Sequence, residues 1–508
     1  MNIDQFAELA EKAIDGDVSS QTEIGNCFSK GVVVNKNDEL AAYWYQKAAD
    51  QGDSNAQYAL GYWYENNNDI DNNIGKAIDW YTKAAEQGNP DALTNLGYLY
   101  YQGEHVQQDL KKAITYFEEA ANLGQPEAQI NLGFCYYAGN GIEKNNEKAF
   151  HWFLKAAEQD NAEAQIILGI CYEFGESVEK DYKKALYWYT KAAEQGSCNA
   201  QYELGSFYEE RADSFDESRE HKLYWYKKAA EQGDSDAQIE IGLFYEFDDD
   251  KEKALYWFTK AAEHGNAKAQ YLLASLYEDE KEEMGKAIDW YTKAAEHGDA
   301  RAQCRLASLY EEGNHINMDL GKALYWYTKA AEQDSCEAQF TLGVKLYSGN
   351  GVTQDSEKAI YYLSKAAEQI ELNTFEIMYA IKAGLFLGST YYSGNGVVQN
   401  YEQAAYWYTK VAYSGNLEDE AIDARVALGE LYYYGYGVEQ NYEKATFWFD
   451  KGIGRSPKAD YYYGVCLLKG LGVNQDINEA ISYLERSSNA GYSLASELLR
   501  EVNKTARQ

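Results

Sequence analysis

The sequence predicts an all-α fold, an α–α superhelix or solenoid of about thirteen two-helix repeats. A Leu-Gly pair recurs every 36 residues, at Leu60, Leu96, Leu132, Leu168 and Leu204. A fixed period of this length is the signature of stacked supersecondary units. Only three prolines occur among 508 residues, whereas the chain contains 48 tyrosines and 11 tryptophans. Low proline and abundant aromatic side chains favour helices that pack around an aromatic core.

The register of this pair continues toward both ends of the chain with small changes. The other pairs begin at Ile241, Leu273, Leu306, Leu342, Leu387 and Leu428, with weaker matches at Ile24 and Tyr463. Together the pairs define thirteen units. Residues 4–15 and 492–502 lie outside them, and we expect both segments to be helices that cap the array.

Each unit begins with a segment such as AQINLGFCYYAGNGI, whose apolar residues recur at helical spacing. We call this predicted element helix A. Its glycine allows a neighbouring helix to approach closely. Gly139 and Gly141 suit a left-handed cap and a tight turn, so helix A is expected to end there.

The second segment of each unit, for example KALYWYTKAAEQG, predicts helix B. It places Ala185, Trp188 and Tyr189 on one face and ends at Gly196. Ten of the eleven tryptophans occupy the position of Trp188 in their own units. Because large residues of helix B would face small residues of helix A, we interpret the tryptophan row as core.

Two irregularities suggest two domains, residues 1–369 with repeats 1–10 and residues 370–508. The A–B loop first shortens to an acidic stub at Asp248 to Asp250. Extra residues then appear near 371–387 and 417–428. We expect two lengthened A helices there, and the sequence leaves open whether they form a hinge or a contact.

The formal charge of −36 argues against several classes of partner. Nucleic-acid phosphates and anionic lipids would be repelled, whereas basic proteins would be attracted over about a Debye length. No apolar run approaches the ~20 residues that span a bilayer. The acidic start of the chain also lacks the features of a signal peptide. We therefore expect a cytoplasmic protein with a basic protein partner and neither nucleic-acid nor membrane binding.

The seven cysteines fall into two groups. Four share one repeat position, two residues after the recurring glycine: Cys27, Cys135, Cys171 and Cys466. We expect them to be buried, reduced thiols, because no matched pairing predicts disulfides. The other three, expected to be more exposed, lie near the starts of A helices: Cys198, Cys304 and Cys336.

The unit A-x-x-x-L-G-x-x-Y-x-x-G-x-G-V followed by K-A-x-x-W-Y-x-K-A-A-E-Q-G resembles the Sel-one-like repeat family, relatives of tetratricopeptide repeats. The likeness covers nearly the whole chain. It implies a right-handed superhelix and an adaptor that holds another protein on its concave face. Roles in this family range from membrane-protein quality control to bacterial signalling, host interaction and toxin neutralisation. The paired cysteines of the secreted branch are missing here, so the resemblance does not imply a disulfide-stapled secreted role.

No catalytic, cofactor-binding or metal-binding set emerges from the sequence. Two of the six histidines, His264 and His297, replace the Gln of E-Q-G, and the others are scattered. They form neither an H-E-x-x-H pattern nor a convergent metal set. The Gly-x-Gly turns follow helices and lack the third glycine of a phosphate loop, so they are better explained as helix caps. We expect no cofactor, no metal and no small-molecule ligand.

The resemblance implies that helix A lines the inner surface, with outward positions that include the fifth residue after the Leu of Leu-Gly. Five consecutive units hold glutamate there: Glu173, Glu209, Glu246, Glu278 and Glu311. Flanking units hold tyrosine: Tyr101, Tyr137, Tyr347, Tyr392 and Tyr433. We predict these ten residues to bind a partner. The glutamates also fit a solvated face of an acidic protein, and the tyrosines also fit packing between repeats.

Three functional hypotheses follow. The leading one is a non-enzymatic scaffold that wraps a basic protein segment in an acidic groove. The second is an immunity protein or antitoxin that occludes one cognate toxin, which coexpression with an adjacent lethal gene would test. The third is an enzyme or ligand sensor in residues 370–430, which would need convergent polar groups that the sequence does not display.

Overall fold

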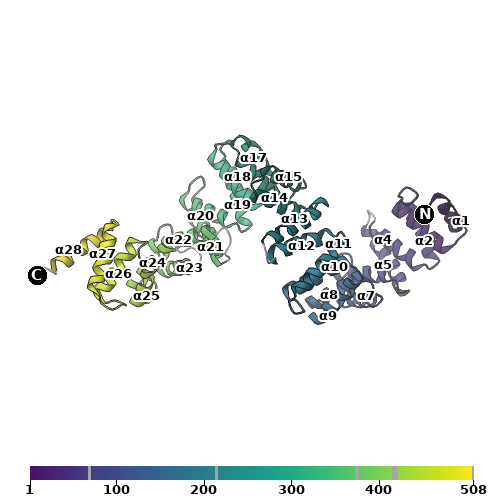
Figure 1. The fold of residues 1–508 in the computed structure, drawn as a ribbon, viewed down its shortest axis with the longest axis horizontal. Helices are drawn as coiled ribbons and strands as arrows, with labels where there is room; N and C mark the ends of the chain where they lie inside the picture. The colour runs from purple at the N-terminus through teal and green to yellow at the C-terminus, as the bar shows by residue number, and fades with distance from the viewer. Residues whose placement is uncertain (67–69, 212–214, 372–376, 415–420, 506–508) are drawn as a thin grey trace. The chain divides into compact units, whose positions relative to one another are not determined.

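The structure is a computed structural model, and it describes residues 1–66, 70–211, 215–371, 377–414 and 421–505. Within these ranges the chain forms 28 α helices, two short 3-10 helices, η1 (Lys281–Glu283) and η2 (Gln369–Glu371), and no strand. The predicted all-α fold is confirmed (Figure 1).

Helices α2 to α27 form thirteen consecutive pairs, and each pair is one repeat with a helix A and a helix B. The A helices are α2 (Val18–Lys30), α4 (Ser54–Glu65), α6 (Pro90–Gln102), α8 (Pro126–Ala138), α10 (Ala162–Phe174), α12 (Cys198–Arg211), α14 (Ser235–Phe247), α16 (Ala267–Glu278), α18 (Ala300–Glu312), α20 (Cys336–Ser348), α22 (Ile377–Ser393), α24 (Ile422–Tyr434) and α26 (Pro457–Lys469). The B helices are α3 (Asp38–Asp50), α5 (Ile70–Glu86), α7 (Leu110–Asn122), α9 (Asn146–Glu158), α11 (Tyr182–Glu194), α13 (Phe215–Glu231), α15 (Lys251–Glu263), α17 (Met284–Glu296), α19 (Leu320–Glu332), α21 (Ser356–Glu368), α23 (Tyr401–Ala412), α25 (Tyr442–Asp450) and α27 (Ile477–Asn489). Helices α1 (Ile3–Ile14) and α28 (Ser493–Thr505) occupy the two ends, as the sequence predicts for capping helices.

The ends of the helices follow the capping residues in the sequence. Asp181 precedes α11, and its side chain accepts a 3.1 Å hydrogen bond from the backbone N–H of Lys184. This bond satisfies a donor that has no partner within the helix. Helix α8 ends at Gly139, whose φ of 77° lies in the left-handed region. Glycine adopts this conformation without steric strain because it has no Cβ. The predicted stop of helix A at this glycine is confirmed.

Helices A and B of one repeat pack closely because the glycine of each Leu-Gly pair faces a large side chain of helix B. A Cβ added to Gly97 would lie 2.6 Å from ring carbons of Phe117, and Phe117 is itself 1% exposed. No side chain fits between the two at that distance, so the glycine fixes how closely the helices approach.

The tryptophan row does not form the core in most repeats, which corrects the prediction. Tyr189, one residue after Trp188, is the side chain that faces Gly169 and is buried. One residue along a helix is a rotation of about 100°, so Trp188 lies half-buried at the edge of the core. Among the tryptophans of the described ranges, Trp407 and Trp448 are buried.

A row of buried glutamines, present in nine of the first ten repeats, joins neighbouring repeats. Gln165 of α10 donates a 3.1 Å hydrogen bond to the carbonyl of Ala157 in α9. It also accepts a 2.8 Å bond from Gln195, which follows α11. Because Gln165 is fully buried, these bonds compensate for the loss of water around its amide. Gln21 donates in the same way to α1, the N-terminal capping helix. The donation to the preceding B helix recurs at other repeats: Gln57, Gln129, Gln201, Gln238, Gln270, Gln303 and Gln339.

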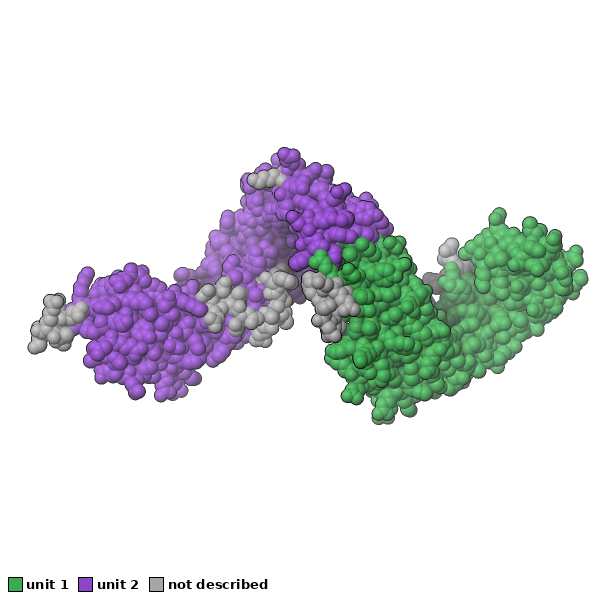
Figure 2. All heavy atoms as spheres, viewed as in Figure 1, with its two compact units in different colours: residues 1–241 green, residues 242–508 purple. Residues whose placement is uncertain are grey.

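The chain divides into two compact units, residues 1–241 and 242–508, within α14 (Figure 2). The sequence places the boundary near residue 370 instead. There the structure has one continuous cluster of buried residues that includes Leu363, Ile370 and Leu387. The described residues on the two sides of 372–376 thus share one core, and the predicted domain boundary near residue 370 stays a prediction.

One of the two predicted lengthened A helices is present. Helix α22 contains 17 residues, whereas α10 and most other A helices contain 13. Helix α24 also contains 13, so the predicted lengthening near 417–428 is wrong. This helix begins only at Ile422. Residues 372–376 and 415–420 of the two insertions lie outside the described residues.

All seven cysteines are free thiols, and six are buried. Burial of the four that share a repeat position is confirmed. The prediction of greater exposure is wrong at Cys304 and Cys336. The Sγ of Cys304 is 3.6 Å from the Oγ of Ser335, the residue that caps α20. The Cys336 thiol donates to the carbonyl of Ala366, in helix B of its own repeat, at 3.5 Å. Cys198 is half-buried.

Candidate functional site

The five predicted glutamates lie near the C-terminal ends of A helices, in different environments. Glu173 and Glu209 belong to the first unit, and Glu246, Glu278 and Glu311 belong to the second. Two of them, Glu209 and Glu246, are exposed. Glu173 is only 6% exposed. The expectation that this position faces solvent is therefore wrong at Glu173, whose carboxylate lies against helix B of its own repeat.

Three of these carboxylates accept a hydrogen bond from a buried tyrosine of helix B. The pairs are Tyr189 with Glu173 at 2.8 Å, Tyr226 with Glu209 at 3.3 Å and Tyr291 with Glu278 at 2.6 Å. Burial, followed by the adjacent carboxylate, raises the pKa of each tyrosine. The hydroxyl therefore stays protonated and donates to the carboxylate. These glutamates stabilise the packing of helix A on helix B.

Sequence reasoning missed a further member of this set. Glu65 of α4 occupies the same repeat position and accepts a 2.6 Å hydrogen bond from Tyr81 of α5. Tyr81 also accepts a 2.9 Å bond from the side-chain amide of Asn95. The signal was present as a correlation. In five of the six repeats that have glutamate at this position of helix A, helix B has tyrosine at its core-facing position.

Basic side chains contact three of the predicted glutamates. The ion pairs join Glu209 to Lys222, Glu278 to Arg305 and Glu311 to Lys345. Arg305 also donates from Nε to Glu278 at 2.9 Å. Each pair reduces the charge that a basic partner would meet at that repeat.

Glu246 has a different neighbour, because Phe258 takes the place of the tyrosine and has no hydroxyl to donate. Partial burial of its carboxylate, followed by the charge of Asp279, raises the pKa of Glu246. Glu246 remains exposed in α14. The glutamate row is thus a mixture of structural acceptors, ion pairs and one more open carboxylate.

The five predicted tyrosines are all half-buried. In three of them the hydroxyl bonds to the A–B loop of the next repeat: Tyr101 accepts from Asn140 at 2.8 Å, Tyr137 donates to Glu176 at 2.9 Å, and Tyr347 donates to the carbonyl of Asn395 at 2.8 Å. The ring centroids of Tyr392 and Tyr433 lie 5.4 Å from Tyr401 and 5.5 Å from Tyr442, respectively. Packing between repeats accounts for the first three, and the partner-binding role of all ten residues stays a prediction.

A different surface stands out in the first unit, on helices α4, α6, α8 and α10. None of these four helices contains a lysine or an arginine. Large aromatic side chains at the same position of three of them are exposed: Tyr62 at 54%, Tyr98 at 48% and Phe134 at 44%. Carboxylates stand in the first turns of α6, α8 and α10: Asp91, Glu127 and Glu163. We call these six residues the aromatic–acidic face.

Two pockets lie against this face between α6 and α8. One, of about 310 Å³, is lined by Tyr98, Tyr101, Phe117, Asn131, Phe134, Cys135, Tyr137 and Ala138. The other, of about 250 Å³, is lined by Thr94, Asn95, Tyr98, Glu127, Ile130, Asn131, Phe134 and Glu163. The first is mostly aromatic and the second contains two carboxylates.

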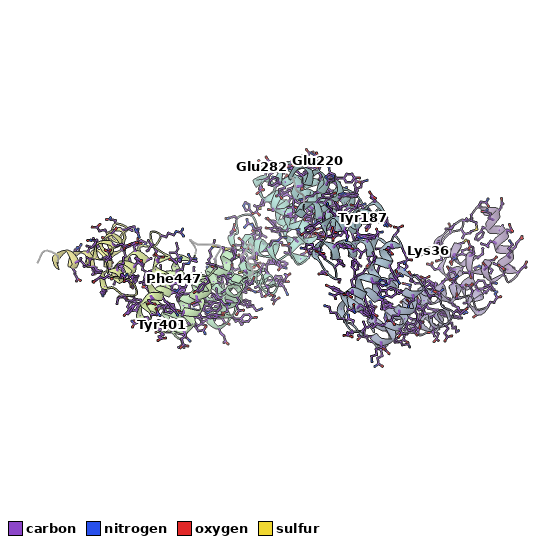
Figure 3. All side chains as sticks on the ribbon, turned by 60° about the horizontal axis from the view of Figure 1, so that its bottom comes forward. Lys36, Tyr187, Glu220, Glu282, Tyr401 and Phe447 are labelled. Carbon is purple, nitrogen blue, oxygen red and sulfur yellow. The ribbon has the colours of Figure 1, made fainter. Side chains whose placement is uncertain are left out.

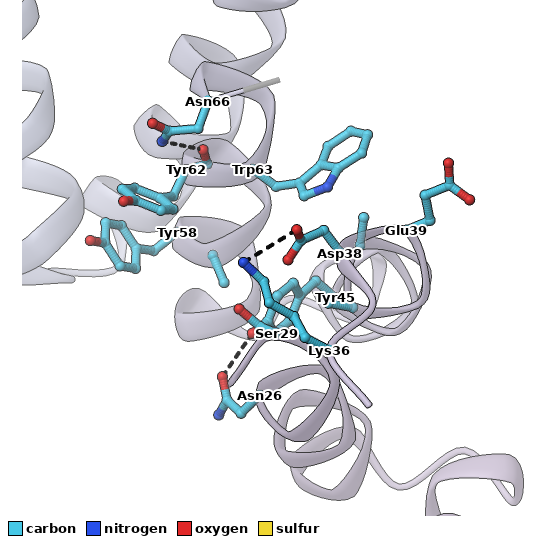
Figure 4. A pocket seen from close by; sticks show the side chains of 13 residues that line it. Asn26, Ser29, Lys36, Asp38, Glu39, Tyr45, Tyr58, Tyr62, Trp63 and Asn66 are labelled. Carbon is cyan, nitrogen blue, oxygen red and sulfur yellow. Dashed lines mark hydrogen bonds and ion pairs between the residues drawn. The ribbon is translucent and has the colours of Figure 1, made fainter. Parts of the chain in front are cut away.

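A larger cavity, of about 1030 Å³, lies beside α2, α3 and α4 (Figure 4). Tyr58, Tyr62 and Trp63 of α4 line it, and Lys36 reaches into it from the loop before α3. The ammonium of Lys36 is 3.4 Å from Asp38. A cation of the chain itself therefore already occupies part of this cavity.

Thirteen matches to the Sel1 repeat model cover most of the chain. They span residues 18–53, 54–89, 90–125, 126–161, 162–197, 198–234, 235–266, 267–299, 300–335, 336–370, 382–416, 422–453 and 457–492. The chain belongs to the Sel1 repeat family. Each match corresponds to one pair of helices A and B, although the match 382–416 begins within α22. The predicted count of thirteen repeats and the suspected family are confirmed.

One solved structure supports the Sel1 repeat fold over nearly the whole length, and two others match part of the chain. A protective antigen of uropathogenic Escherichia coli with an SLR fold is 30% identical, with 97% of each chain covered and a TM-score of 0.50. A Sel1 repeat protein of Oxalobacter formigenes is 34% identical, with 42% of this chain and 85% of that chain covered and a TM-score of 0.38. An immunity protein of Pseudomonas aeruginosa is 22% identical, with coverages of 42% and 81% and a TM-score of 0.30. A comparison with curated proteins gave no match.

Sel1 repeat proteins are generally non-catalytic scaffolds for protein interactions. In the described residues of this one, no group of three or more His, Cys, Asp and Glu side chains is arranged to hold a metal ion. Over the same part of the chain, no helix combines the length and apolar character needed to cross a bilayer.

Proposed function

We propose that this Sel1 repeat protein is a scaffold that binds a basic protein segment on the aromatic–acidic face. The observation that carries the proposal is the composition of α4, α6, α8 and α10. These helices present carboxylates and exposed aromatic rings, and they contain no lysine or arginine. A basic segment would therefore meet no like charge on these helices.

This location differs from the glutamate row of repeats 5–9. There Glu209, Glu278 and Glu311 already contact basic side chains of the chain itself. A partner would have to displace those ion pairs to use the carboxylates. Glu127 and Glu163 of the aromatic–acidic face are exposed in the first turns of α8 and α10. Acidic side chains are also common at helix N-termini because they interact favourably with the helix dipole. The proposal therefore depends as well on the exposed aromatic side chains beside these two glutamates.

The exposed aromatic rings supply the apolar part of the interaction. Exposed apolar patches on repeat proteins commonly mark interaction surfaces. Tyrosine and phenylalanine bring large contact area with few rotatable bonds. The net charge of −36 would steer a basic partner toward the protein and speed association at low salt.

The test compares a triple variant, Asp91→Lys, Glu127→Lys and Glu163→Lys, with a matched control. The control carries Glu86→Lys, Glu158→Lys and Glu194→Lys, which change the net charge equally at exposed positions on B helices of the same unit. Each protein is used to capture partners from a native lysate at low and high salt. We expect a basic protein to be retained by the wild type and control at low salt and lost by the triple variant. Equal retention by both variants would contradict the proposal.

The immunity hypothesis has no observation of its own in this structure. The similarity to the immunity protein of Pseudomonas is too distant to carry it, and it stays a prediction. Cytoplasmic location is likewise a proposal, supported by seven free cysteines. Fractionation of the native cells, with the protein detected by antibody, tests it.

A further inference from the structure

We propose that the surface between α6 and α8 recognises a two-part signal, one bulky apolar side chain beside one basic side chain in the same short segment of the partner. The inference rests on the proposed function and specifies which pair of partner side chains the protein recognises. It stands on the two adjacent pockets and on the different chemistry of their walls.

The larger pocket accepts the apolar side chain. Four exposed or half-buried aromatic residues line it: Tyr98, Tyr101, Phe134 and Tyr137. The hydroxyls of Tyr101 and Tyr137 are engaged with the A–B loops of the next repeats, through Asn140 and Glu176. The pocket therefore offers mainly apolar ring surface. At about 310 Å³ it lies at the small end of the range for ligand pockets, which suits one side chain.

The smaller pocket accepts the basic side chain. Glu127 of α8 and Glu163 of α10 both line it, and Asn131 adds an amide that can bond to a peptide. Neither α8 nor α10 carries a basic residue that would compete for these carboxylates. Phe134 also lines the pocket, and an aromatic ring attracts a nearby ammonium or guanidinium group.

The two pockets are close enough to be filled by one segment. Tyr98, Asn131 and Phe134 line both of them, so the pockets lie on either side of the same side chains. When an apolar residue and a basic residue are near each other in the partner's sequence, the first can enter the larger pocket while the second enters the smaller one. Binding both at once gives more affinity than either alone, because the entropy of bringing the segment to the surface is lost only once.

The test measures binding of three synthetic fluorescent peptides of equal length to the full chain by anisotropy. One contains lysine and leucine in a glycine–serine background, one contains only the lysines, and one contains only the leucines. We expect the mixed peptide to bind at least tenfold more tightly than either of the others. The Phe134→Ser variant should remove the gain from leucine and also weaken the lysine peptide, because Phe134 lines both pockets. Glu127→Gln with Glu163→Gln should remove the gain from lysine and leave the binding of the leucine peptide unchanged.

Two controls keep the outcome clear. Serine occurs naturally at the position of Phe134 two repeats later, as Ser206, so the repeat accommodates it. Tyr187→Ser removes another exposed aromatic ring, on α11, and should leave binding unchanged (Figure 3). If the lysine peptide binds as tightly as the mixed one, or if Phe134→Ser has no effect, the two-part rule is overturned and the scaffold proposal stands. If neither lysine-containing peptide binds, both fail.

Discussion

The hydroxyl of Tyr189 in α11 donates a 2.8 Å hydrogen bond to the carboxylate of Glu173 in α10, and both side chains are buried. The bond joins helix A and helix B of one repeat. Equivalent bonds recur from Tyr81 to Glu65 and from Tyr291 to Glu278. A residue predicted for partner binding thus stabilises its own repeat.

The first prediction concerns this bond. Tyr189→Phe should destabilise the repeat by about 1.5–3 kcal/mol, the usual range for a hydrogen bond to a charged group. Because long repeat arrays do not unfold in one step, the effect should be measured locally, by hydrogen exchange in α10 and α11. Tyr187→Phe is the control, since Tyr187 is 58% exposed. Unchanged exchange in α10 and α11 would show that the bond contributes little.

The second prediction concerns the glycine of Leu-Gly. Gly97→Ala should destabilise the repeat by about 1–3 kcal/mol, the usual cost of overpacking, because the added Cβ would lie 2.6 Å from Phe117. Gly75→Ala is the matched control in the same unit: it lies in α5 with no atom within 4 Å of an added Cβ. It should instead stabilise by up to about 1 kcal/mol. Hydrogen exchange, measured in α6 and α7 for Gly97→Ala and in α5 for Gly75→Ala, checks this. Faster exchange in both variants would contradict the packing argument.

The third prediction concerns pH. Burial, followed by the charge of Glu173, raises the pKa of Glu203 above 4.5. The folded state therefore binds this proton more tightly than the unfolded state, and stability rises as pH falls through the raised pKa toward 4.5. Glu203→Gln should stabilise its repeat at pH 7, seen as slower hydrogen exchange in α12 and α13, and make no difference to stability well below pH 4.5. The exposed Glu158→Gln serves as control. If Glu203→Gln instead lowers the stability at pH 7, the Glu203 carboxylate stabilises the folded state and the prediction is wrong.

The fourth prediction concerns the thiols. Iodoacetamide at pH 8, followed by peptide mass mapping, should label Cys198 first in the native protein, because the other six cysteines are buried. Burial also raises the pKa of Cys135 and Cys171 to about 11 and that of Cys466 to about 12, which leaves little reactive thiolate. Rapid native labelling of Cys135 would mean that its repeat opens readily. All seven should react after denaturation.

Much of the fold could be predicted because the same sequence pattern recurs in each repeat. The Leu-Gly period, the glycine caps and the helical spacing recur in independent copies, so the assignment of helices did not depend on any one of them. The core position was missed by one residue: Trp188 and Tyr189 are both large, and only the packing against Gly169 distinguishes which one is buried. The buried glutamine row was missed because glutamine is usually exposed, although A-x-A-Q and E-Q-G recur throughout the sequence.

The sequence by itself determined the all-α repeat architecture, the number of repeats and the positions of the capping helices, because these depend on local periodicity and helix ends. Only the tertiary structure decided what the residues at one repeated position do. Glu173 accepts a bond from Tyr189, Glu311 pairs with Lys345 from the next A helix, and Tyr137 reaches the loop of the next repeat. Such roles depend on neighbours that are far away in sequence, and the same holds for the pockets between α6 and α8.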